Sequence, residues 1–403
     1  MKKVFIIGAG ASGLTAAIKA SKNYDVTIFE KNNKPGKKIL ITGNGKCNYW
    51  NENQDIKNYH SSGDYTKIVN QINLVKAHAF LDSIGIVPFI KNGYYYPNSQ
   101  QAISVVNALV DEAINNNVKF IYEEVIDVKK EGNRFIVTTN NSEYESDILI
   151  VATGGKAAPK TGSDGFGYKI AEKFGHNLIK PLPALVGLEI EENLKDLSGI
   201  RSTGEVKLII DNEFYQSEVG EIQINDYGFS GIPVMQISSN AVKALDKKQN
   251  VSISINYLPN IASDILGLRS FLKVQSKHLN NKTISQILDQ LFNYKLSNYF
   301  LNKSKINKDS MVEKLSNDEL DLLCHYILND SYKVIKDHGF DNAQVTSGGI
   351  DLKEVNLDTL ESLKVNGLYF CGEILDVDGA CGGYNLSFAW ISGIIAGEVR
   401  GDK

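Results

Sequence analysis

The chain has 403 residues, a formal net charge of −4, 42% hydrophobic residues and 22% charged residues. These values are ordinary for a soluble globular protein and predict two or three domains. The slight negative charge gives no general attraction to nucleic acid or anionic membranes, and no apolar stretch approaches the ~20 residues that span a bilayer. The four cysteines are scattered without a CxxC pair. We therefore expect a cytoplasmic protein with reduced thiols, no metal site, and no membrane or nucleic-acid partner.

The first thirty residues predict a strand, a glycine turn, a helix, a second strand and a terminal acid. This order is typical of the βαβ unit that binds a dinucleotide. In the turn GAGASG, Gly8 allows the tight bend, Gly10 lets a pyrophosphate approach the backbone, and Gly13 lets the helix pack closely. Glu30 ends the second strand, where its carboxylate would accept the ribose hydroxyls of an adenosine. That charge favours FAD or NAD over NADP, whose 2′-phosphate it would repel.

The segments that follow predict the rest of the first domain. Residues 31–48 are rich in Gly, Asn and Lys, which favours an anion-facing loop under the cofactor. A solvated surface loop is the alternative. Residues 65–85 and 100–116 have helical periodicity. Residues 118–151 read as strands, and the last one runs into Ala152-Thr153-Gly154, a small-residue end typical of a second contact with FAD.

The middle of the chain reads as an insertion. Short alternating apolar segments predict a small β-barrel over residues 184–260 with 331–340, and helical spacing predicts a helical subdomain over 261–330. Residues 1–183 and 341–403 would then form one discontinuous domain. The expected fold class is α/β, a Rossmann-type FAD-binding domain with a parallel sheet plus the inserted barrel and helices.

A second group of candidate cofactor-binding residues lies near the C-terminus. A buried strand ends in Gly372-Glu373, which would place a carboxylate on a ribitol hydroxyl of a flavin. The turn Gly382-Gly383-Tyr384-Asn385 opens an apolar helix, whose N-terminus would stabilise negative charge at the pyrimidine edge of the reduced flavin. A strand, turn and helix that merely close the fold are the alternative.

Six stretches of the chain resemble the BaiN-like (NAD(P)/FAD-dependent oxidoreductase) flavoprotein family, and they run along its whole length. They are residues 8–13, 36–48, 161–165, 227–231, 346–349 and 372–379. The resemblance implies bound FAD in a single Rossmann domain with an inserted barrel and helical subdomain. Some relatives are linked to reduction of conjugated carbon–carbon double bonds in steroid-like acids, and others are labelled amine oxidases.

The chain also departs from the family pattern. Lys46 stands where the family often has Arg, Asn225-Asp226 stand where many relatives have Thr-His, and Cys381 stands where many have Thr. A catalytic role of that His in relatives therefore cannot be carried over to this chain.

The residues predicted to bind the cofactor belong to the glycine turns, the strand ends and the charged loop. They are Gly8, Gly10, Ala11, Ser12, Gly13, Glu30, Lys31, Gly36, Lys37, Gly43, Asn44, Gly45, Cys47, Asn48, Val125, Ala152, Thr153, Gly154, Asp164, Gly372, Glu373, Asp376, Gly383, Tyr384, Asn385 and Leu386. Candidate acid–base groups are Cys47, Tyr384, Cys381 and Asp376. A polar loop beside Lys46 would stabilise a Cys47 thiolate, and a packed structural cysteine is the alternative.

The leading prediction is an FAD-dependent oxidoreductase for a small or medium organic substrate, with reduction of a conjugated double bond by NAD(P)H as one form of it. A single dinucleotide fingerprint is present, so a nicotinamide would have to dock transiently as electron donor. The alternatives are a flavin-bearing redox-sensing or binding protein without turnover, and an amine oxidase. A tRNA-modifying flavoprotein is disfavoured by the net acidic chain.

Overall fold

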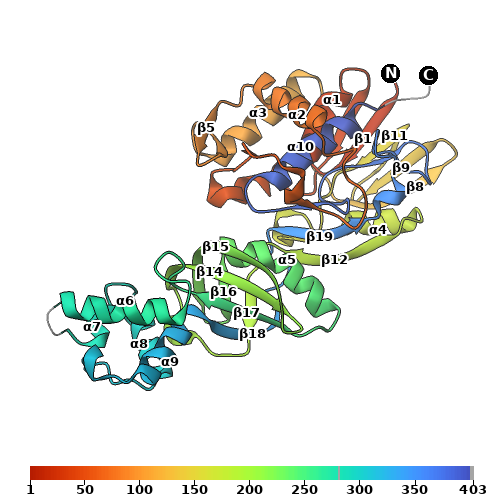
Figure 1. Ribbon diagram of the computed structural model, residues 1–403. Helices are drawn as coiled ribbons and strands as arrows, with labels where there is room; N and C mark the ends of the chain where they lie inside the picture. Colours follow the sequence, from red (N-terminus) through yellow and green to blue (C-terminus); the bar gives the residue numbers. More distant parts are fainter. Residues whose placement is uncertain (280–281, 400–403) are drawn as a thin grey trace. The chain divides into compact units, whose positions relative to one another are not determined.

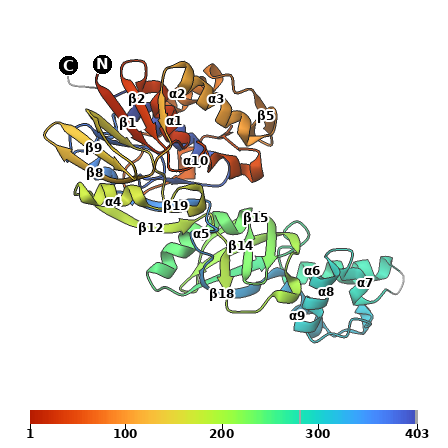
Figure 2. The same cartoon turned by 180° about the vertical axis from the view of Figure 1, so that it is seen from behind.

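The computed structural model describes residues 1–279 and 282–399. The chain divides into two compact units (Figures 1 and 2). The first contains Met1–Pro183 and the segment from Phe340 onward, and the second contains Ala184–Gly339. None of the helices within the described ranges has the length and apolarity of a membrane-spanning helix.

The first unit is built on a five-stranded sheet with the order β20-β11-β1-β2-β7. Its pairings are parallel, with Ile6 opposite Ile150 of β11 and Ile28 of β2. The strands are apolar because both faces of the sheet are covered. Their bounds are β1 Lys3–Ile7, β2 Asp25–Phe29, β7 Lys119–Ile121, β11 Ile148–Val151 and β20 Leu368–Phe370.

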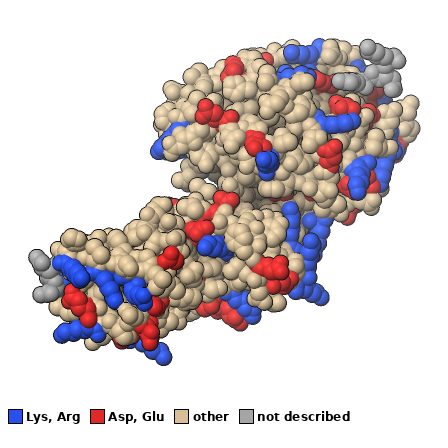
Figure 3. Space-filling model, in the orientation of Figure 1, with Lys and Arg blue, Asp and Glu red and all other residues tan. Residues whose placement is uncertain are grey.

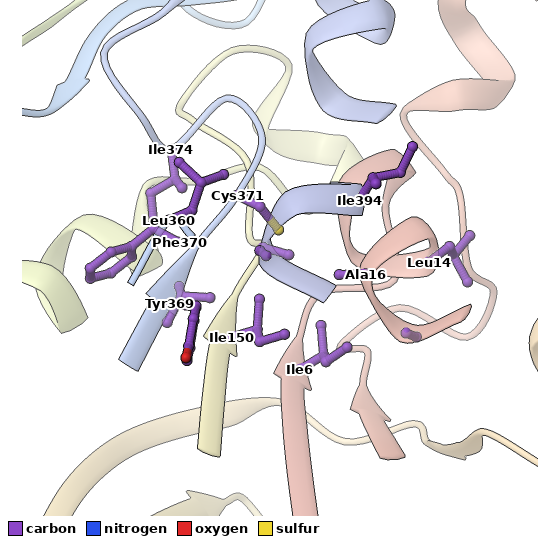
Figure 4. Close-up of a cluster of buried hydrophobic side chains, with 14 of the residues drawn as sticks. Ile6, Leu14, Ala16, Ile150, Leu360, Tyr369, Phe370, Cys371, Ile374 and Ile394 are labelled. Carbon is purple, nitrogen blue, oxygen red and sulfur yellow. The ribbon is translucent and has the colours of Figure 1, made fainter. Parts of the chain in front are cut away.

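Helices cover one face of this sheet. The helices of this unit are α1 Ala11–Ala20, α2 Gln71–Ser83, α3 Ala102–Asn115, α4 Phe166–Lys173 and α10 Tyr384–Gly397. The last helix, α10, packs along α1 (Figure 1). The two backbones approach so closely that a side-chain Cβ at Gly393 would lie 2.6 Å from the Ser12 carbonyl oxygen, and one at Gly397 would lie 2.5 Å from that of Ala16. Figure 4 shows part of this core, in which Ile6 and Ile150 lie side by side on neighbouring strands, with Ala16 of α1 beside them.

Shorter strands complete the first unit. The other face of the main sheet carries an antiparallel meander, where Tyr144 makes edge contacts with Phe5 and Phe29. The first unit also contains three small sheets, with the strand orders β12-β19, β21-β4 and β3-β6-β5. The bounds are β3 Trp50–Asn51, β4 Tyr59–His60, β5 Pro88–Lys91, β6 Tyr94–Pro97, β8 Val125–Glu131, β9 Arg134–Thr139, β10 Glu143–Ser146, β12 Leu178–Ala184, β19 Val345–Ile350 and β21 Asp378–Gly379.

The second unit is a closed barrel with helices attached. Its strand order is β13-β16-β15-β14-β17-β18, and all pairings are antiparallel. Apolar residues alternate along the strands and fill the interior, as the sequence pattern predicts. The bounds are β13 Leu188–Ile190, β14 Arg201–Ile210, β15 Glu213–Asn225, β16 Gly228–Gly231, β17 Val251–Asn256 and β18 Asp330–Asp337. Helix α5, Ile232–Asp246, packs on the barrel.

Within the described residues, the unit also contains four further helices: α6 Ile265–His278, α7 Ile284–Leu288, α8 Tyr294–Lys303 and α9 Asn317–Leu328. A partly buried ion pair joins them to the barrel, because Lys303 Nζ of α8, whose side chain is 29% exposed, lies 2.5 Å from an oxygen of Asp330 in β18. Asp330 is 1% exposed and also accepts hydrogen bonds from the hydroxyls of Tyr332 and Tyr299. The predicted fold class, a Rossmann-type α/β domain with a β-barrel and a helical part, is confirmed.

A buried histidine makes the stability of the first unit depend on pH. His176 is 3% exposed, its Nε2 lies 2.8 Å from Ser362 Oγ, and its Nδ1 lies 3.4 Å from a Glu354 oxygen. Burial is the main cause that lowers the pKa of His176, nearby Lys364 lowers it further, and Glu354 opposes the shift. In the unfolded chain the His176 imidazole therefore takes up a proton near pH 6.5, whereas in the folded chain it does so only at lower pH.

We expect the free energy of unfolding to fall as the pH drops from 7.5 to 5.5. One such group contributes at most about 1.4 kcal/mol per pH unit. Urea unfolding at both pH values would measure the loss, and His176→Phe is expected to reduce it. An equal loss in the variant would show that other groups cause the pH dependence. His60, which is half-exposed, provides the matched control as His60→Phe.

Candidate active site

A single long cavity in the first unit gathers most of the predicted cofactor residues. It is lined by the β1–α1 turn, the end of β2, residues 31–42, the end of β11 with the following loop, and the start of α10. Parallel strands end at the same edge of a sheet, so β1, β2 and β11 bring these loops together. The arrangement is the crevice at the carboxyl ends of strands in which Rossmann-type domains hold their ligands.

The glycines of the first turn have distinct roles. A Cβ on Gly8 would lie 2.6 Å from the Ala152 carbonyl oxygen, and one on Gly13 would lie 1.9 Å from the Gly8 carbonyl oxygen. These two positions need glycine for close backbone packing. A Cβ on Gly10 would meet no atom within 4 Å, although Gly10 lines the cavity. The open space there is where the phosphates of a dinucleotide would approach the N-terminus of α1.

Glu30 is fixed at the end of β2 by its neighbours. One carboxylate oxygen accepts the N–H of Ala9 at 2.9 Å, and the other accepts both the backbone and side-chain N–H groups of Asn32 at 2.8 Å. The side chain is 8% exposed and lines the cavity. A buried, oriented carboxylate at this position is suited to ribose hydroxyls.

Two hydroxyl groups in the cavity wall lack partners. Within the described part of the chain, Thr153 Oγ1 and Ser163 Oγ are buried and make no hydrogen bond. Both residues line the cavity. The two hydroxyls face the backbone, since a Cβ on Gly167 would lie 2.0 Å from Thr153 Oγ1 and one on Gly154 would lie 2.7 Å from Ser163 Oγ. The open space beside Gly10 and the fixed carboxylate of Glu30 are therefore the features of the cavity that fit a dinucleotide.

Two ion pairs link residues 31–42 to other walls of the cavity. Lys38 Nζ lies 2.7 Å from Glu373 Oε2, and Lys31 Nζ lies 2.7 Å from Asp164 Oδ2. All four residues line the cavity. Asp164 also accepts the Phe166 N–H, and both contacts lower the pKa of its carboxyl although burial opposes them.

The cavity lining includes more than half of the predicted cofactor residues. Those in the lining are Gly8, Gly10, Ala11, Ser12, Glu30, Lys31, Gly36, Lys37, Val125, Ala152, Thr153, Gly154, Asp164, Glu373, Asn385 and Leu386. Those outside it are Gly13, Gly43, Asn44, Gly45, Cys47, Asn48, Gly372, Asp376, Gly383 and Tyr384. The structure therefore brings the two ends of the chain into one site, with α10 beside the β1–α1 turn.

The lining also contains residues that the sequence did not single out. They are Ile7, Ala9, Phe29, Asn32, Lys38, Ile39, Thr42, Glu123, Glu124, Thr161, Gly162, Ser163, Phe166, Gln344, Val345, Val377, Phe388 and Ala389. Most of them are sequence neighbours of predicted residues, so the motifs identified the chain segments that line the cavity but not all of the lining side chains. Lys38 lies next to the predicted Lys37, and its partner Glu373 is distant in the sequence.

The candidate acid–base groups are all outside the lining. Cys47 is buried, and its burial raises the pKa of its thiol to about 12, so the thiol is protonated at neutral pH. This environment is that of a packed cysteine and not of a stabilised thiolate. Cys381 is half-buried and is not part of a disulfide. The Tyr384 hydroxyl donates to the Asn53 carbonyl oxygen and accepts from Asn58 Nδ2.

Asp376, like Tyr384, directly precedes a residue that lines the cavity. Its carboxylate is 3% exposed and accepts hydrogen bonds from the backbone and hydroxyl of Ser62 and from the hydroxyl of Ser61. Burial raises the pKa of Asp376, and the nearby charge of Asp378 adds to the effect. The hydrogen bonds tie the C-terminal loop to residues 61 and 62 behind the cavity wall.

Residues 2–399 match the protein family described as the HI0933-like protein Rossmann domain. A 3-dehydro-bile acid delta(4,6)-reductase of Clostridium scindens is 35% identical, and the alignment covers 100% of both chains. A ribosomal RNA dihydrouridine synthase of Haemophilus influenzae is 31% identical and is aligned over 96% of this chain and 95% of its own. The enzyme of the same description from Escherichia coli is 30% identical, with coverage of 96% and 95%.

Proposed function

The chain belongs to the HI0933-like family of Rossmann-domain proteins, and on that premise we propose that it uses bound FAD to reduce a carbon–carbon double bond conjugated with a carbonyl group. The predicted class, an oxidoreductase, is confirmed by the reductase that is 35% identical over the whole chain. The double bond, its conjugation and the electron donor are proposals.

The main support for this proposal is that relatives with different substrates are named for the same bond change, which is saturation of a carbon–carbon double bond conjugated with a carbonyl group. A 3-dehydro-bile acid has a ketone, and the delta(4,6) bonds of the reductase's name are conjugated with it. Dihydrouridine arises when the ring double bond of uridine, conjugated with a ring carbonyl, is saturated. Such bonds accept hydride because the carbonyl oxygen takes up the developing negative charge.

The residues of this chain that would hold FAD are those lining the cavity. Glu30 would accept the ribose hydroxyls, and the N-terminus of α1 beside Gly10 would face the phosphates. Bound FAD would supply the hydride chemistry. The start of α10 would provide N–H groups and partial positive charge at its end of the cavity, through Asn385 and Leu386.

The proposal predicts a defined set of reactions. The purified protein is expected to bind FAD, and NADH or NADPH should bleach the flavin absorbance without oxygen. A 3-oxo-4-ene steroid acid or another enone should then restore the absorbance at least about a hundredfold faster than the matching compound with an isolated double bond, because only the conjugated bond places charge on oxygen. Stopped-flow absorbance measures both steps.

Three results of this experiment would contradict the proposal. Failure to bind FAD would remove the flavin assignment. Equal reoxidation by conjugated and isolated double bonds would remove the reaction class. Reduction of the flavin by amines, with no reoxidation by enones, would favour an amine oxidase instead.

RNA as the substrate is a second candidate, favoured by two relatives that are named ribosomal RNA dihydrouridine synthases. The helical part of the second unit, residues 261–330, has nine basic and eight acidic residues, and Arg269 and Lys303 are paired with Asp321 and Asp330, so its charge is nearly balanced. Lys273 and Lys277 stand one turn apart on the exposed side of α6. Figure 3 shows basic side chains over this part of the molecule, with acidic groups beside them.

The earlier expectation of no nucleic-acid partner stays a prediction, and one variant separates the two candidates. Lys273→Glu with Lys277→Glu is expected to weaken binding of a ribosomal RNA fragment by about tenfold or more at low salt if RNA is the substrate. The same variant should reduce an enone at the wild-type rate. Loss of the uridine double bond, measured by mass spectrometry of the RNA, would establish this candidate, and its absence with active enzyme would exclude it.

A further inference from the structure

Residues 31–42, which we call the cavity loop, form one side of the cofactor cavity. Seven of them line it: Lys31, Asn32, Gly36, Lys37, Lys38, Ile39 and Thr42. The loop is anchored at its middle, where the Gly36 N–H donates to the Ala9 carbonyl oxygen at 2.8 Å and a Cβ on Gly36 would contact Val106 of α3 at 2.8 Å. The parts of the loop on either side of Gly36 reach other walls through charged side chains.

The contact at Lys38 differs from the other contacts of the cavity loop. Lys38 Nζ lies 2.7 Å from Glu373 Oε2, and the two side chains are 23% and 18% exposed. The pair of Lys31 and Asp164 is more open to solvent, with exposures of 27% and 43%. Lys37 donates only a long hydrogen bond of 3.2 Å to the neutral Asn32 side chain. Solvent screening is therefore weakest for the pair of Lys38 and Glu373.

Glu373 is held on a rigid part of the unit. Its other oxygen accepts the N–H of Thr346 in β19 at 2.9 Å. The Thr346 hydroxyl accepts the N–H groups of Lys156 and Ala157 at 2.8 and 3.0 Å. A Cβ on Gly155 would lie 2.8 Å from Glu373 Oε1, so the backbone packs directly against the carboxylate. Lys38 thus joins the cavity loop to a fixed point across the cavity.

We propose that the ion pair of Lys38 and Glu373 is a clasp that retains the cofactor, with Lys38 as the positioning residue that holds Glu373 and the cavity loop together. This inference rests on the proposed FAD binding and goes beyond it, because it assigns the rate of cofactor release to one contact. A dinucleotide in the cavity leaves by displacement of the cavity loop, and that displacement breaks the clasp.

The test measures the rate of FAD release from the holoprotein into an excess of a flavin-trapping apoprotein, followed by flavin fluorescence. Lys38→Met is expected to release FAD roughly 5- to 30-fold faster, as expected for loss of one partly buried charged hydrogen bond. Lys38→Arg, which keeps the charge and the donor, should restore a rate near that of the wild type. Lys34→Met is the matched control, since Lys34 is an exposed lysine of the same loop outside the lining, and it should leave the rate unchanged.

A double variant decides whether Lys38 acts through Glu373. In the Glu373→Gln background the clasp is already broken, so adding Lys38→Met should change the release rate by less than about twofold. If Lys38→Met accelerates release equally in both backgrounds, Lys38 acts directly on the cofactor and the clasp is wrong. If Lys38→Met releases FAD at the wild-type rate, the clasp is also wrong. Failure of the wild-type protein to bind FAD would instead overturn the proposed function.

Discussion

Gly10→Val is expected to weaken FAD binding by more than about a hundredfold while the apoprotein folds normally. The backbone at Gly10 has φ −83° and ψ −168°, which a valine adopts without strain. A Cβ there meets no protein atom within 4 Å, so the new side chain extends into the cavity instead of into the core. It would occupy the space through which the phosphates approach the N-terminus of α1, and close approach at this position is what glycine allows.

Fluorescence titration of the apoprotein with FAD measures the affinity, and circular dichroism measures folding. Gly10→Ala should show a smaller loss, in proportion to its side chain. Gly13→Val serves as the contrast, because its Cβ would lie 1.9 Å from the Gly8 carbonyl oxygen and should disrupt folding as well as binding. FAD binding by Gly10→Val within a few-fold of the wild type would show that the phosphates do not pass this turn.

Lys303→Met is expected to lower the stability of the second unit by about 2–3 kcal/mol, because the buried Asp330 carboxylate loses its charged partner. Asp330 would be left as a carboxylate that is 1% exposed, with only the hydroxyls of Tyr299 and Tyr332 as partners. The Lys303 ammonium also lies about 5 Å from three tyrosine rings, so the variant removes cation–π contacts too.

Hydrogen exchange of β18 peptides, together with the thermal midpoint of the full chain, measures the change in this unit. Lys295→Met replaces an exposed lysine on the same helix and should change stability by less than about 0.5 kcal/mol. Lys303→Met combined with Asp330→Asn should recover part of the loss, since no unpaired charge is left buried. Unchanged exchange in Lys303→Met would show that the tyrosines alone support Asp330.

The βαβ unit could be predicted from the sequence because its signal is local. The buried strands, the glycine spacing and the acid at the end of β2 all lie within thirty residues, and each has a direct physical cause. The barrel and the helical part were also predictable in kind, because alternation and helical spacing persist over long segments. The ion pair of Lys38 and Glu373 could not be predicted, because it joins two residues that are far apart in the sequence.

Cys47 shows why local composition does not determine the direction of a side chain. Its neighbours are Gly, Asn and Lys, which indicate an exposed polar loop. In the structure the loop turns sharply through left-handed conformations, with φ of 55° at Gly43 and 56° at Cys47. This bend directs the thiol into the interior, where burial raises its pKa. The sequence left both a stabilised thiolate and a packed cysteine open, because the pKa depends on neighbours in space, and the structure agrees with the packed cysteine.

The packing of α10 on α1 has a consequence for the order in which the protein forms during synthesis. The first strand and helix leave the ribosome before the second unit, whereas β20, which completes their sheet, and α10, which covers α1, are synthesised after it. Ala184–Gly339 is continuous in sequence and separates the two halves of the first unit, so it is the part able to fold while translation continues. The apolar surface of α1 and the edge of β11 therefore stay uncovered until α10 and β20 have been synthesised. Cofactor loading is therefore expected to follow the synthesis of α10, whose start lines the cavity.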